Sequence, residues 1–175
     1  TALATHGGYE VDTAGDGMFA VFPRASDAVA AAVDAQRGLA AHPWPGPPVR
    51  LRMGLHTGEP FVTEAGYTGV DVHRCARICS AAYGEQVLLS EATRALVQAS
   101  LPDGVTLHDL GENLLRGLPE PEHLYQLVIP GLPAGFPPLR TLMDRPHNLP
   151  RPATPLLGRE REVEAVEGLL RTGVR

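Results

Sequence analysis

The sequence predicts an α+β domain built on a mixed sheet with helices packed on one of its faces. Short runs in which apolar residues alternate with polar ones, typical of half-buried strands, are separated by segments whose apolar residues recur at helical spacing. These elements do not follow the regular alternation of βαβ units, which argues against a Rossmann fold. With 175 residues, 43% of them hydrophobic, the chain can bury one substantial core.

The first predicted element is a hairpin of two strands, Tyr9 to Thr13 and Met18 to Phe22. Between them lies Asp16-Gly17, a pair typical of tight turns because Gly17 can adopt a positive φ without a Cβ clash. The Asp16 carboxylate is a candidate metal ligand. The alternative is that the pair serves only as a turn.

A helix follows, with Ser26 as its candidate N-cap, and runs to about Ala41, where a proline-rich loop ends it. From Val49 to Leu55, apolar and polar residues alternate as in a half-buried strand. Gly54 and Gly58 lie near the end of this strand and indicate a close approach of backbone or ligand. For His56, between them, a hydrogen-bonded histidine at a strand end is favoured over a general base.

The second half of the chain continues the mixture of strands and helices. We expect helices over 69–82 and 90–99, the second of them capped by Ser90. Strands are expected over 86–89, 105–110 and 123–129, with 112–118 as a further candidate.

Charge and cysteine content exclude several classes of function. A net charge of −5 argues against nonspecific nucleic-acid binding. No apolar run approaches the roughly 20 residues needed to cross a bilayer, and the start lacks the anatomy of a signal peptide, so we expect a soluble globular protein. Cys75 and Cys79 are the only cysteines, and we expect both to be reduced, packed thiols rather than a disulfide framework or a four-ligand zinc site. A cytoplasmic location is the expectation that follows from this use of cysteine.

Composition changes after Ile129, where proline becomes frequent. We therefore expect a first domain over 1–130 and an extended proline-rich linker over 131–155 that cannot pack as a core element. Residues 156–175 then resume an amphipathic helical pattern that is too short to fold alone, and we interpret them as the start of another domain.

Four segments lie in order along the chain, namely Val11–Phe22, Arg52–Glu59, Tyr67–Ile78 and Gly84–Ser90, followed by the shorter motifs 109–111 and 115–121. Together they resemble the class III adenylate/guanylate cyclase catalytic domain in both order and spacing. The resemblance covers about residues 5–130. It implies a ferredoxin-like class III nucleotide cyclase fold, with the family's first strand and helix missing from this chain.

The resemblance also implies roles for individual residues. In the family, two aspartates hold two magnesium-like ions, and Asp16 matches the second of them, so Mg²⁺ or Mn²⁺ is the implied cofactor. Arg77 matches the arginine that stabilises charge on the transferring phosphate, and Arg116 lies near the family's basic, phosphate-contacting turn. His73 is four residues before Arg77 on the same helical face and replaces the family's usual asparagine. It either contacts phosphate or ribose or is a partly exposed helix histidine.

Two departures concern base recognition. The family's base-selecting lysine falls at Asp12, and its base-selecting aspartate falls near Gly66, so base recognition is expected to be altered or lost. An acidic Asp12 close in sequence to Asp16 either attracts another cation or repels the triphosphate.

In the family, the metal aspartates and the arginine of one site come from different chains, which implies a head-to-tail homodimer acting on ATP or GTP. One hypothesis is a nucleotide cyclase, with cAMP favoured over cGMP and with weak or absent activity in this chain. The other is a degenerate cyclase-like module that senses nucleotide or dimerises to regulate a downstream ATPase. The tail at 148–150 and 158–160 resembles the entry to the ATPase domain of bacterial LuxR-type regulators, although no Walker A loop is present.

Overall fold

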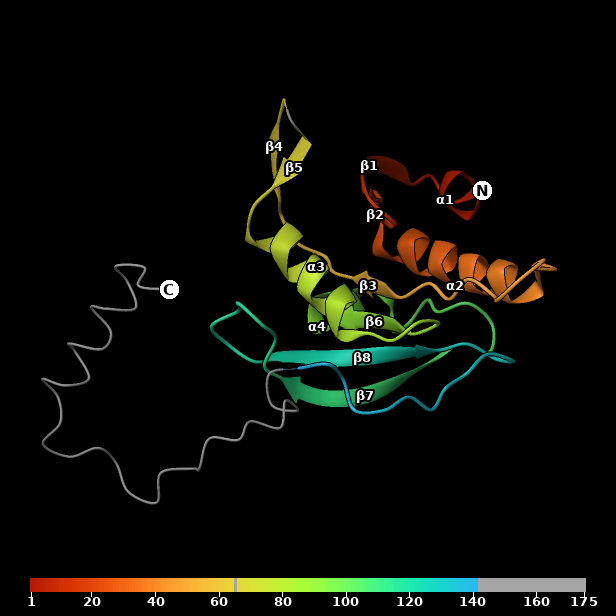
Figure 1. Ribbon diagram of the computed structural model, residues 1–175. Helices are drawn as coiled ribbons and strands as arrows, with labels where there is room; N and C mark the ends of the chain where they lie inside the picture. Colours follow the sequence, from red (N-terminus) through yellow and green to blue (C-terminus); the bar gives the residue numbers. More distant parts are fainter. Residues whose placement is uncertain (65, 142–175) are drawn as a thin grey trace, which may run out of the picture. The chain divides into compact units, whose positions relative to one another are not determined.

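The computed structural model describes residues 1–64 and 66–141, which form helices and strands in mixed order (Figure 1). In chain order the elements are α1 (Ala2–Thr5), β1 (Tyr9–Ala14), β2 (Gly17–Val21), α2 (Ala25–Ala41), β3 (Met53–Leu55), β4 (Phe61–Thr63), β5 (Gly66–Thr68), α3 (Val70–Ala81), β6 (Val87–Ser90), α4 (Glu91–Val97), β7 (Thr106–Asn113) and β8 (Glu122–Val128).

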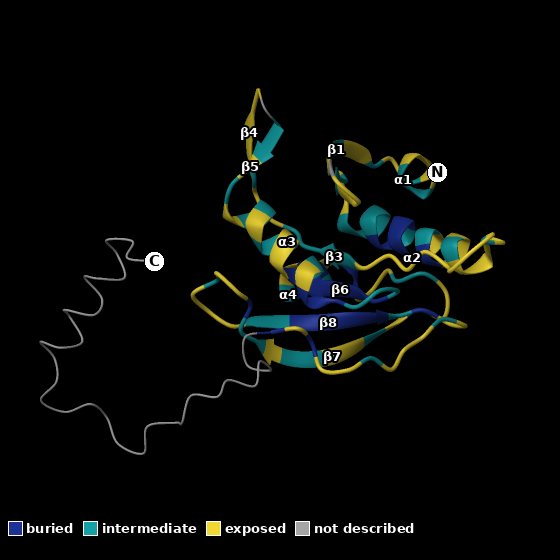
Figure 2. Ribbon diagram, in the orientation of Figure 1, coloured by how far each residue is buried: buried dark blue, intermediate teal, exposed yellow. Residues whose placement is uncertain are grey.

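The central sheet has four strands in the order β3-β6-β8-β7. Strand β3 runs parallel to β6, whereas β8 is antiparallel to both of its neighbours, β6 and β7. The sheet is therefore mixed, and the predicted α+β class is confirmed. Strand β6 is buried along its whole length, and β8 beside it is largely buried (Figure 2).

Helices cover both faces of this sheet. Successive side chains of a strand point to opposite sides, and those of β6 are apolar on both. Val87 and Leu89 of β6 belong to one hydrophobic cluster with residues of α2 and α4. Leu88, between them, belongs to a second cluster that contains Ile78 of α3. The expectation of helices on a single face is therefore wrong, since the alternation along β6 supplies an apolar surface to each side.

Three predicted boundaries differ from those observed. Ser26 is not the N-cap of α2, because the helix begins at Ala25 and Arg24 precedes it. The Arg24 side chain does not cap the helix but pairs with Asp27 in the first turn at 2.8 Å. The strand expected from residue 49 begins at Met53, because the Leu51 carbonyl instead accepts hydrogen bonds from the Gln36 side chain and another backbone N–H. The candidate strand 112–118 is not formed, since β7 ends at residue 113 and a loop follows.

Two hairpins are paired only within themselves, β1 with β2 and β4 with β5. The first confirms the predicted hairpin, although its two-residue turn is Gly15-Asp16, with Gly15 rather than Gly17 at positive φ. The second was not predicted from the sequence. It projects away from the sheet (Figure 1), and its Phe61 and Val62 side chains are exposed.

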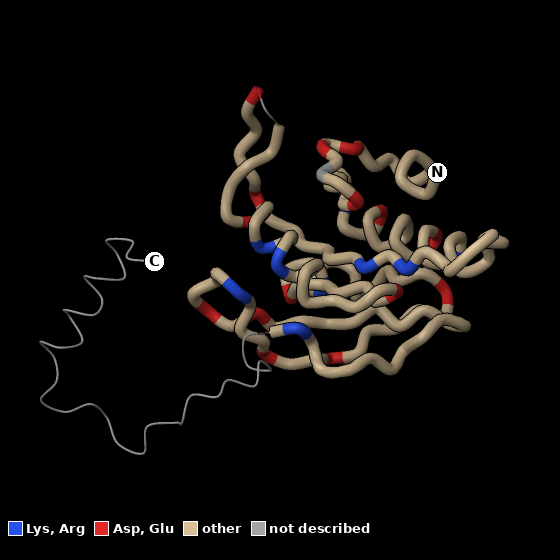
Figure 3. The backbone as a smooth tube through the Cα atoms, in the orientation of Figure 1, with Lys and Arg blue, Asp and Glu red and all other residues tan. Residues whose placement is uncertain are grey.

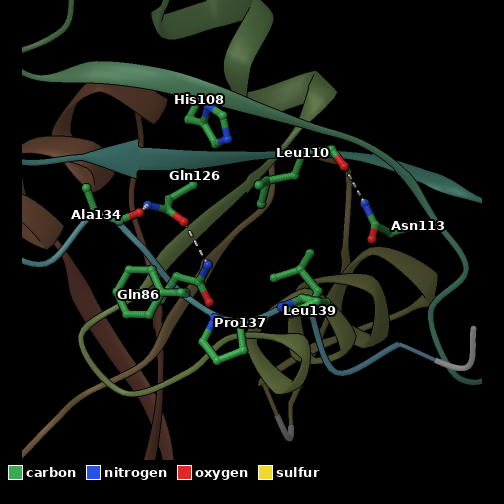
Figure 4. A pocket seen from close by; sticks show the side chains of 10 residues that line it. Gln86, His108, Leu110, Asn113, Gln126, Ala134, Pro137 and Leu139 are labelled. Carbon is green, nitrogen blue, oxygen red and sulfur yellow. Dashed lines mark hydrogen bonds between the residues drawn. The ribbon is translucent and has the colours of Figure 1, made fainter. Parts of the chain in front are cut away.

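The segment after β8 lies against the sheet as far as residue 141. Leu139 is buried in the cluster that contains Ile78, and the Gln126 side chain donates to the Ala134 carbonyl at 2.7 Å. A pocket of about 270 Å³ lies beneath this segment, where the Gln86 and Gln126 amides hydrogen-bond to each other (Figure 4). The expectation that proline-rich sequence beyond 130 cannot pack therefore does not apply to 131–141. The other residues of the predicted linker and the predicted start of a further domain at 156–175 lie outside the described residues.

Candidate functional site

Helix α3 presents two of the candidate site residues on one exposed face. His73, Ala76, Arg77 and Ser80 are exposed, and their spacing of three and four residues places them in one stripe along the helix. Ile78 and Ala81, which border this stripe, are buried in the cluster that packs against the sheet. The fold therefore holds His73 and Arg77 outward on a helix whose back is fixed to the sheet.

The side of α3 that faces strand β3 carries both cysteines. Cys75 donates to the Gly54 carbonyl at 3.3 Å, and Cys79 donates to the Arg52 carbonyl at 3.7 Å. Burial raises the pKa of the Cys75 thiol to about 11 and also raises the pKa of Cys79. Both are free, as expected, and both are protonated at neutral pH.

The loop between β7 and β8 brings a second basic residue to the same region. Leu115 is buried and anchors this loop, whereas Arg116 is exposed. Gly117 has φ +79°, and a Cβ at this position would lie 3.9 Å from Nε of Arg77. Figure 3 shows basic residues on α3 and on this neighbouring loop. Within residues 1–64 and 66–141, no carboxylate forms an ion pair with Arg77 or Arg116.

The acidic candidates lie on the β1–β2 hairpin. Asp16 is exposed in its tight turn. Asp12 is exposed on β1, beside an irregularity in the strand register, and its Oδ1 accepts the Thr13 backbone N–H at 2.8 Å.

Gly66 lies next to this hairpin, at the start of β5. Its φ is +107°, and a Cβ there would lie 3.3 Å from Cγ1 of Val11, the residue before Asp12. The Phe19 and Tyr67 rings also meet edge to face, with centroids 6.5 Å apart. The two positions matched to base selection therefore lie on neighbouring strands of two different hairpins.

Comparison with known proteins gives a consistent result. An uncharacterized protein of Mycobacterium tuberculosis is 44% identical over 169 residues, which is 93% of this chain and 56% of that protein. An adenylate cyclase from Trypanosoma brucei, solved in its monomeric state, has a TM-score of 0.66 at 26% identity, over 80% of this chain and 79% of that one. An adenylate/guanylate cyclase/hydrolase from Silicibacter pomeroyi has a TM-score of 0.65 at 25% identity, over 73% and 76%. The chain has the fold of a class III adenylate/guanylate cyclase domain.

No family model matches the sequence of this cyclase-fold domain. The chain spans about half the length of the curated relatives that it matches first. Among the described residues, no helix is long and apolar enough to cross a membrane.

The cyclase fold implies a divalent metal, and the acidic residues of the hairpin can be tested against that requirement. In the described part of the chain, no three His, Cys, Asp or Glu side chains converge as a metal-binding group. On this hairpin Asp12 accepts the Thr13 backbone N–H and Glu10 accepts the Thr13 hydroxyl, whereas Asp16 is exposed in the turn. The residues present therefore supply one candidate ligand and do not fit a complete metal site.

The structure does not bring all of the candidates together. Arg77 and the loop of Arg116 are neighbours, and His73 shares the exposed face of α3 with Arg77. By contrast, no hydrogen bond or ion pair within the described residues joins Asp16 to any of these three. The acidic and basic candidates thus lie on separate elements.

His56 is the centre of a hydrogen-bond network at the base of α3. Its side chain is 7% exposed, its Nε2 donates to Asp71 Oδ1 at 3.2 Å, and its Nδ1 is 2.8 Å from the Ser90 hydroxyl. Ser90 also caps α4 by accepting the Thr93 N–H, as predicted. The interpretation of His56 as a hydrogen-bonded histidine at a strand end is therefore confirmed.

Gly54 of β3 and Gly58, three residues after the end of that strand, are sites of close approach, as expected. A Cβ at Gly54 would collide with the Cys79 backbone of α3, and a Cβ at Gly58 would collide with the Asp71 carboxylate. Here the approaching group is protein in both cases: the helix backbone at one glycine and a helix side chain at the other.

Sequence reasoning missed three residues of this region: Asp71, Arg74 and Glu122. Arg74 donates to both carboxylates at 2.6 Å and so joins the first turn of α3 to the start of β8. The spacing of Asp71 and Arg74 on a predicted helix was a usable signal for their pairing. No local pattern reveals the contact with Glu122, which is 48 residues away in sequence.

Proposed function

We propose that this domain is a nucleotide cyclase that forms a 3′,5′-cyclic nucleotide from a nucleoside triphosphate in bacterial intracellular signalling, with cAMP favoured over cGMP. The observation that carries the proposal is the pairing of Arg77 with the loop of Arg116. Both cations are exposed and have no carboxylate partner in the described part of the chain. A helix arginine next to a turn that carries a second arginine therefore suits a polyphosphate.

In the proposed reaction, the ribose 3′ oxygen forms a bond to the α-phosphorus. The bond from that phosphorus to the bridging oxygen breaks, the 3′-hydroxyl gives its proton to solvent water, and pyrophosphate leaves. Arg77 donates hydrogen bonds to the phosphoryl oxygens as charge moves toward the leaving group. His73, one turn earlier, adds a hydrogen bond to phosphate or ribose, and Arg116 holds the triphosphate.

A divalent cation, Mg²⁺ or Mn²⁺, is part of the proposal; Asp16 would be one of its ligands, and the ion would neutralise charge on the triphosphate. Because no three His, Cys, Asp or Glu side chains converge in the described part of the chain, Asp16 would need additional ligands to complete the site.

We also propose a head-to-tail homodimer, with Asp16 of one chain and Arg77 of the other at each site. The separation of the acidic and basic candidates supports this arrangement. The β4–β5 hairpin supports it as well, because Phe61 and Val62 are 72% and 73% exposed, and an isolated two-stranded hairpin is marginally stable in water. A second copy of the chain that covers this hairpin would bury its apolar side chains and stabilise its two strands.

The dimer can be tested by sedimentation of Val62→Glu. Leu96→Glu is the matched control, because Leu96 is also an exposed apolar residue, at 61%, but lies on α4. We expect Val62→Glu to weaken self-association at least about tenfold and Leu96→Glu to leave it unchanged. Equal association of the two variants would contradict the role of the hairpin.

The activity can be tested by assaying the full-length protein with ATP and GTP in manganese. We expect Arg77→Ala to lower kcat by about 10²–10³, since a preorganised donor to a developing charge is lost. Arg37→Ala is the control, because Arg37 is also exposed on a helix and has no ion pair within the described residues. Activity that survives Arg77→Ala undiminished would overturn the assignment.

A second candidate function is a degenerate module that senses nucleotide or dimerises to regulate a downstream ATPase domain. It is favoured by Asp12, Gly66 and His73, each of which departs from the family pattern at a position tied to base or ribose. This function predicts binding of triphosphate without turnover. A full-length protein that neither binds nucleotide nor self-associates would exclude it.

A further inference from the structure

We propose that Arg74 is a positioning residue that holds helix α3 and the β7–β8 loop in fixed relation, so that Arg77 and Arg116 act on one polyphosphate. This inference rests on the proposed function for its catalytic consequence. The contacts that carry it lie outside the nucleotide-facing stripe of α3, and Arg74 is not itself proposed to touch the substrate.

Arg74 donates hydrogen bonds from two nitrogens of its guanidinium to two different carboxylates. Its Nη1 donates to Asp71 Oδ1 and its Nε donates to Glu122 Oε1, each at 2.6 Å. The side chain is 29% exposed, and the two carboxylates are 20% and 18% exposed, so these pairs are shielded from solvent more than ordinary surface pairs. Hydrogen bonding to Glu122 raises the pKa of Arg74. A planar fork can serve two carboxylates in this way, whereas a lysine ammonium is a single point of charge.

Asp71 is itself fixed from three sides, which makes it a firm anchor for Arg74. His56 donates to Oδ1, and the Glu59 backbone N–H donates to Oδ2 at 3.0 Å. Its Oδ2 lies so close over Gly58 that a Cβ at that glycine would collide with it. Burial acts to raise the pKa of Asp71, but the hydrogen bonds from His56 and Glu59 and the charge of Arg74 hold it below its ordinary value.

Glu122 is the second carboxylate that Arg74 contacts, and its place at the end of the β7–β8 loop lets Arg74 hold that loop. It is the first residue of β8, directly after the loop that contains Arg116 and Gly117. Gly117 lies beside Arg77, which is three residues after Arg74 on the same helix. The ion pair therefore closes a ring of contacts from α3 to β8, through the loop, and back to α3. Elsewhere in the loop, Leu115 is buried and Leu118 packs against the same hydrophobic cluster.

The test compares Arg74→Gln, Glu122→Gln, their double variant and Arg74→Lys in the full-length protein. The first readout is amide hydrogen exchange of residues 114–121 without nucleotide. We expect exchange in this loop to accelerate about tenfold in Arg74→Gln and Glu122→Gln and exchange in β6 to stay unchanged. Arg94→Gln is the matched control, because Arg94 is 28% exposed and forms an equivalent ion pair with Glu91 three residues earlier, on α4.

The second readout is cyclic nucleotide formation from ATP in manganese. We expect each single variant to lower kcat about tenfold and the double variant to lose no more than Arg74→Gln, because both substitutions break the same Arg74–Glu122 pair. Arg74→Lys is expected to retain the melting temperature but not the full kcat. Loop exchange that is unchanged in folded Arg74→Gln, or single losses that multiply in the double variant, would overturn the inference.

The two proposals fail separately. A wild-type protein without turnover would defeat the proposed function, while loop exchange would still decide whether Arg74 controls the loop. If Arg74→Gln does not fold, Glu122→Gln provides the same exchange measurement, because it leaves the Arg74–Asp71 pair in place.

Discussion

Replacing Gly54 by alanine is expected to push helix α3 away from the sheet. The new Cβ would collide with the backbone nitrogen of Cys79 and would lie 2.7 Å from its Cα. Gly54 is the middle residue of β3, which is paired with β6 through its neighbours on both sides, so the strand cannot retreat. The helix must therefore move by a substantial fraction of an ångström, and Arg77 moves with it.

These contacts set the loss in free energy of unfolding expected for Gly54→Ala. Overpacking costs about 1–3 kcal/mol, and the upper end applies because the obstructing atoms are backbone rather than a flexible side chain. For a domain of about 140 residues, an unfolding entropy near 2.1 cal/mol/K per residue gives roughly 0.3 kcal/mol/K. A loss of about 3 kcal/mol therefore lowers the melting temperature by about 10 °C.

Thermal unfolding followed by circular dichroism measures this shift directly. Gly38→Ala is the control, since a Cβ there meets no atom within 4 Å and Gly38 lies inside helix α2. Alanine in a helix interior stabilises by about 0.5–1 kcal/mol relative to glycine, so this variant should melt a few degrees higher. Equal melting temperatures for Gly54→Ala and wild type would refute the close packing of α3 on β3.

Three further outcomes follow from the contacts around α3. Because burial raises the pKa of Cys75 to about 11, iodoacetamide at pH 8 should label it about 100-fold more slowly than in the urea-unfolded chain; equal rates would contradict its burial. Ser90→Ala removes the α4 cap and a partner of His56, and should cost about 1–2 kcal/mol in urea unfolding. The pKa of Asp71 is lowered on folding, so its stabilisation is complete above about pH 4 and is lost as the pH falls through the folded pKa; the stability difference between wild type and Asp71→Asn should shrink below about pH 4.

Elements whose signals are local could be predicted from the sequence. The turn chemistry around Asp16 gave the first hairpin, the Ser90 hydroxyl gave the start of α4, and helical spacing gave α3 to within one residue at each end. The shared face of His73 and Arg77 follows directly from that helix. The turn itself was misplaced by one residue, since Gly15 and Gly17 are equally able to adopt positive φ.

Features that depend on distant partners could not be predicted. The β4–β5 hairpin has strands of only three residues, too short for an alternating pattern to be visible. The link from Arg74 to Glu122 joins residues 48 apart in sequence. Likewise, nothing local shows that Leu139, in a proline-rich segment, fills a gap beside Leu115 and Ile78.

The central claim, a cyclase site shared between two copies of the chain, is tested most directly by mixing two inactive full-length variants. Arg77→Ala and Asp16→Ala damage opposite halves of each site. Random pairing makes about half of the dimers mixed, and each mixed dimer keeps one intact site of two, so the account predicts recovery to about one quarter of wild-type activity. A mixture as inactive as either variant alone, although the chains exchange freely, would contradict the shared site.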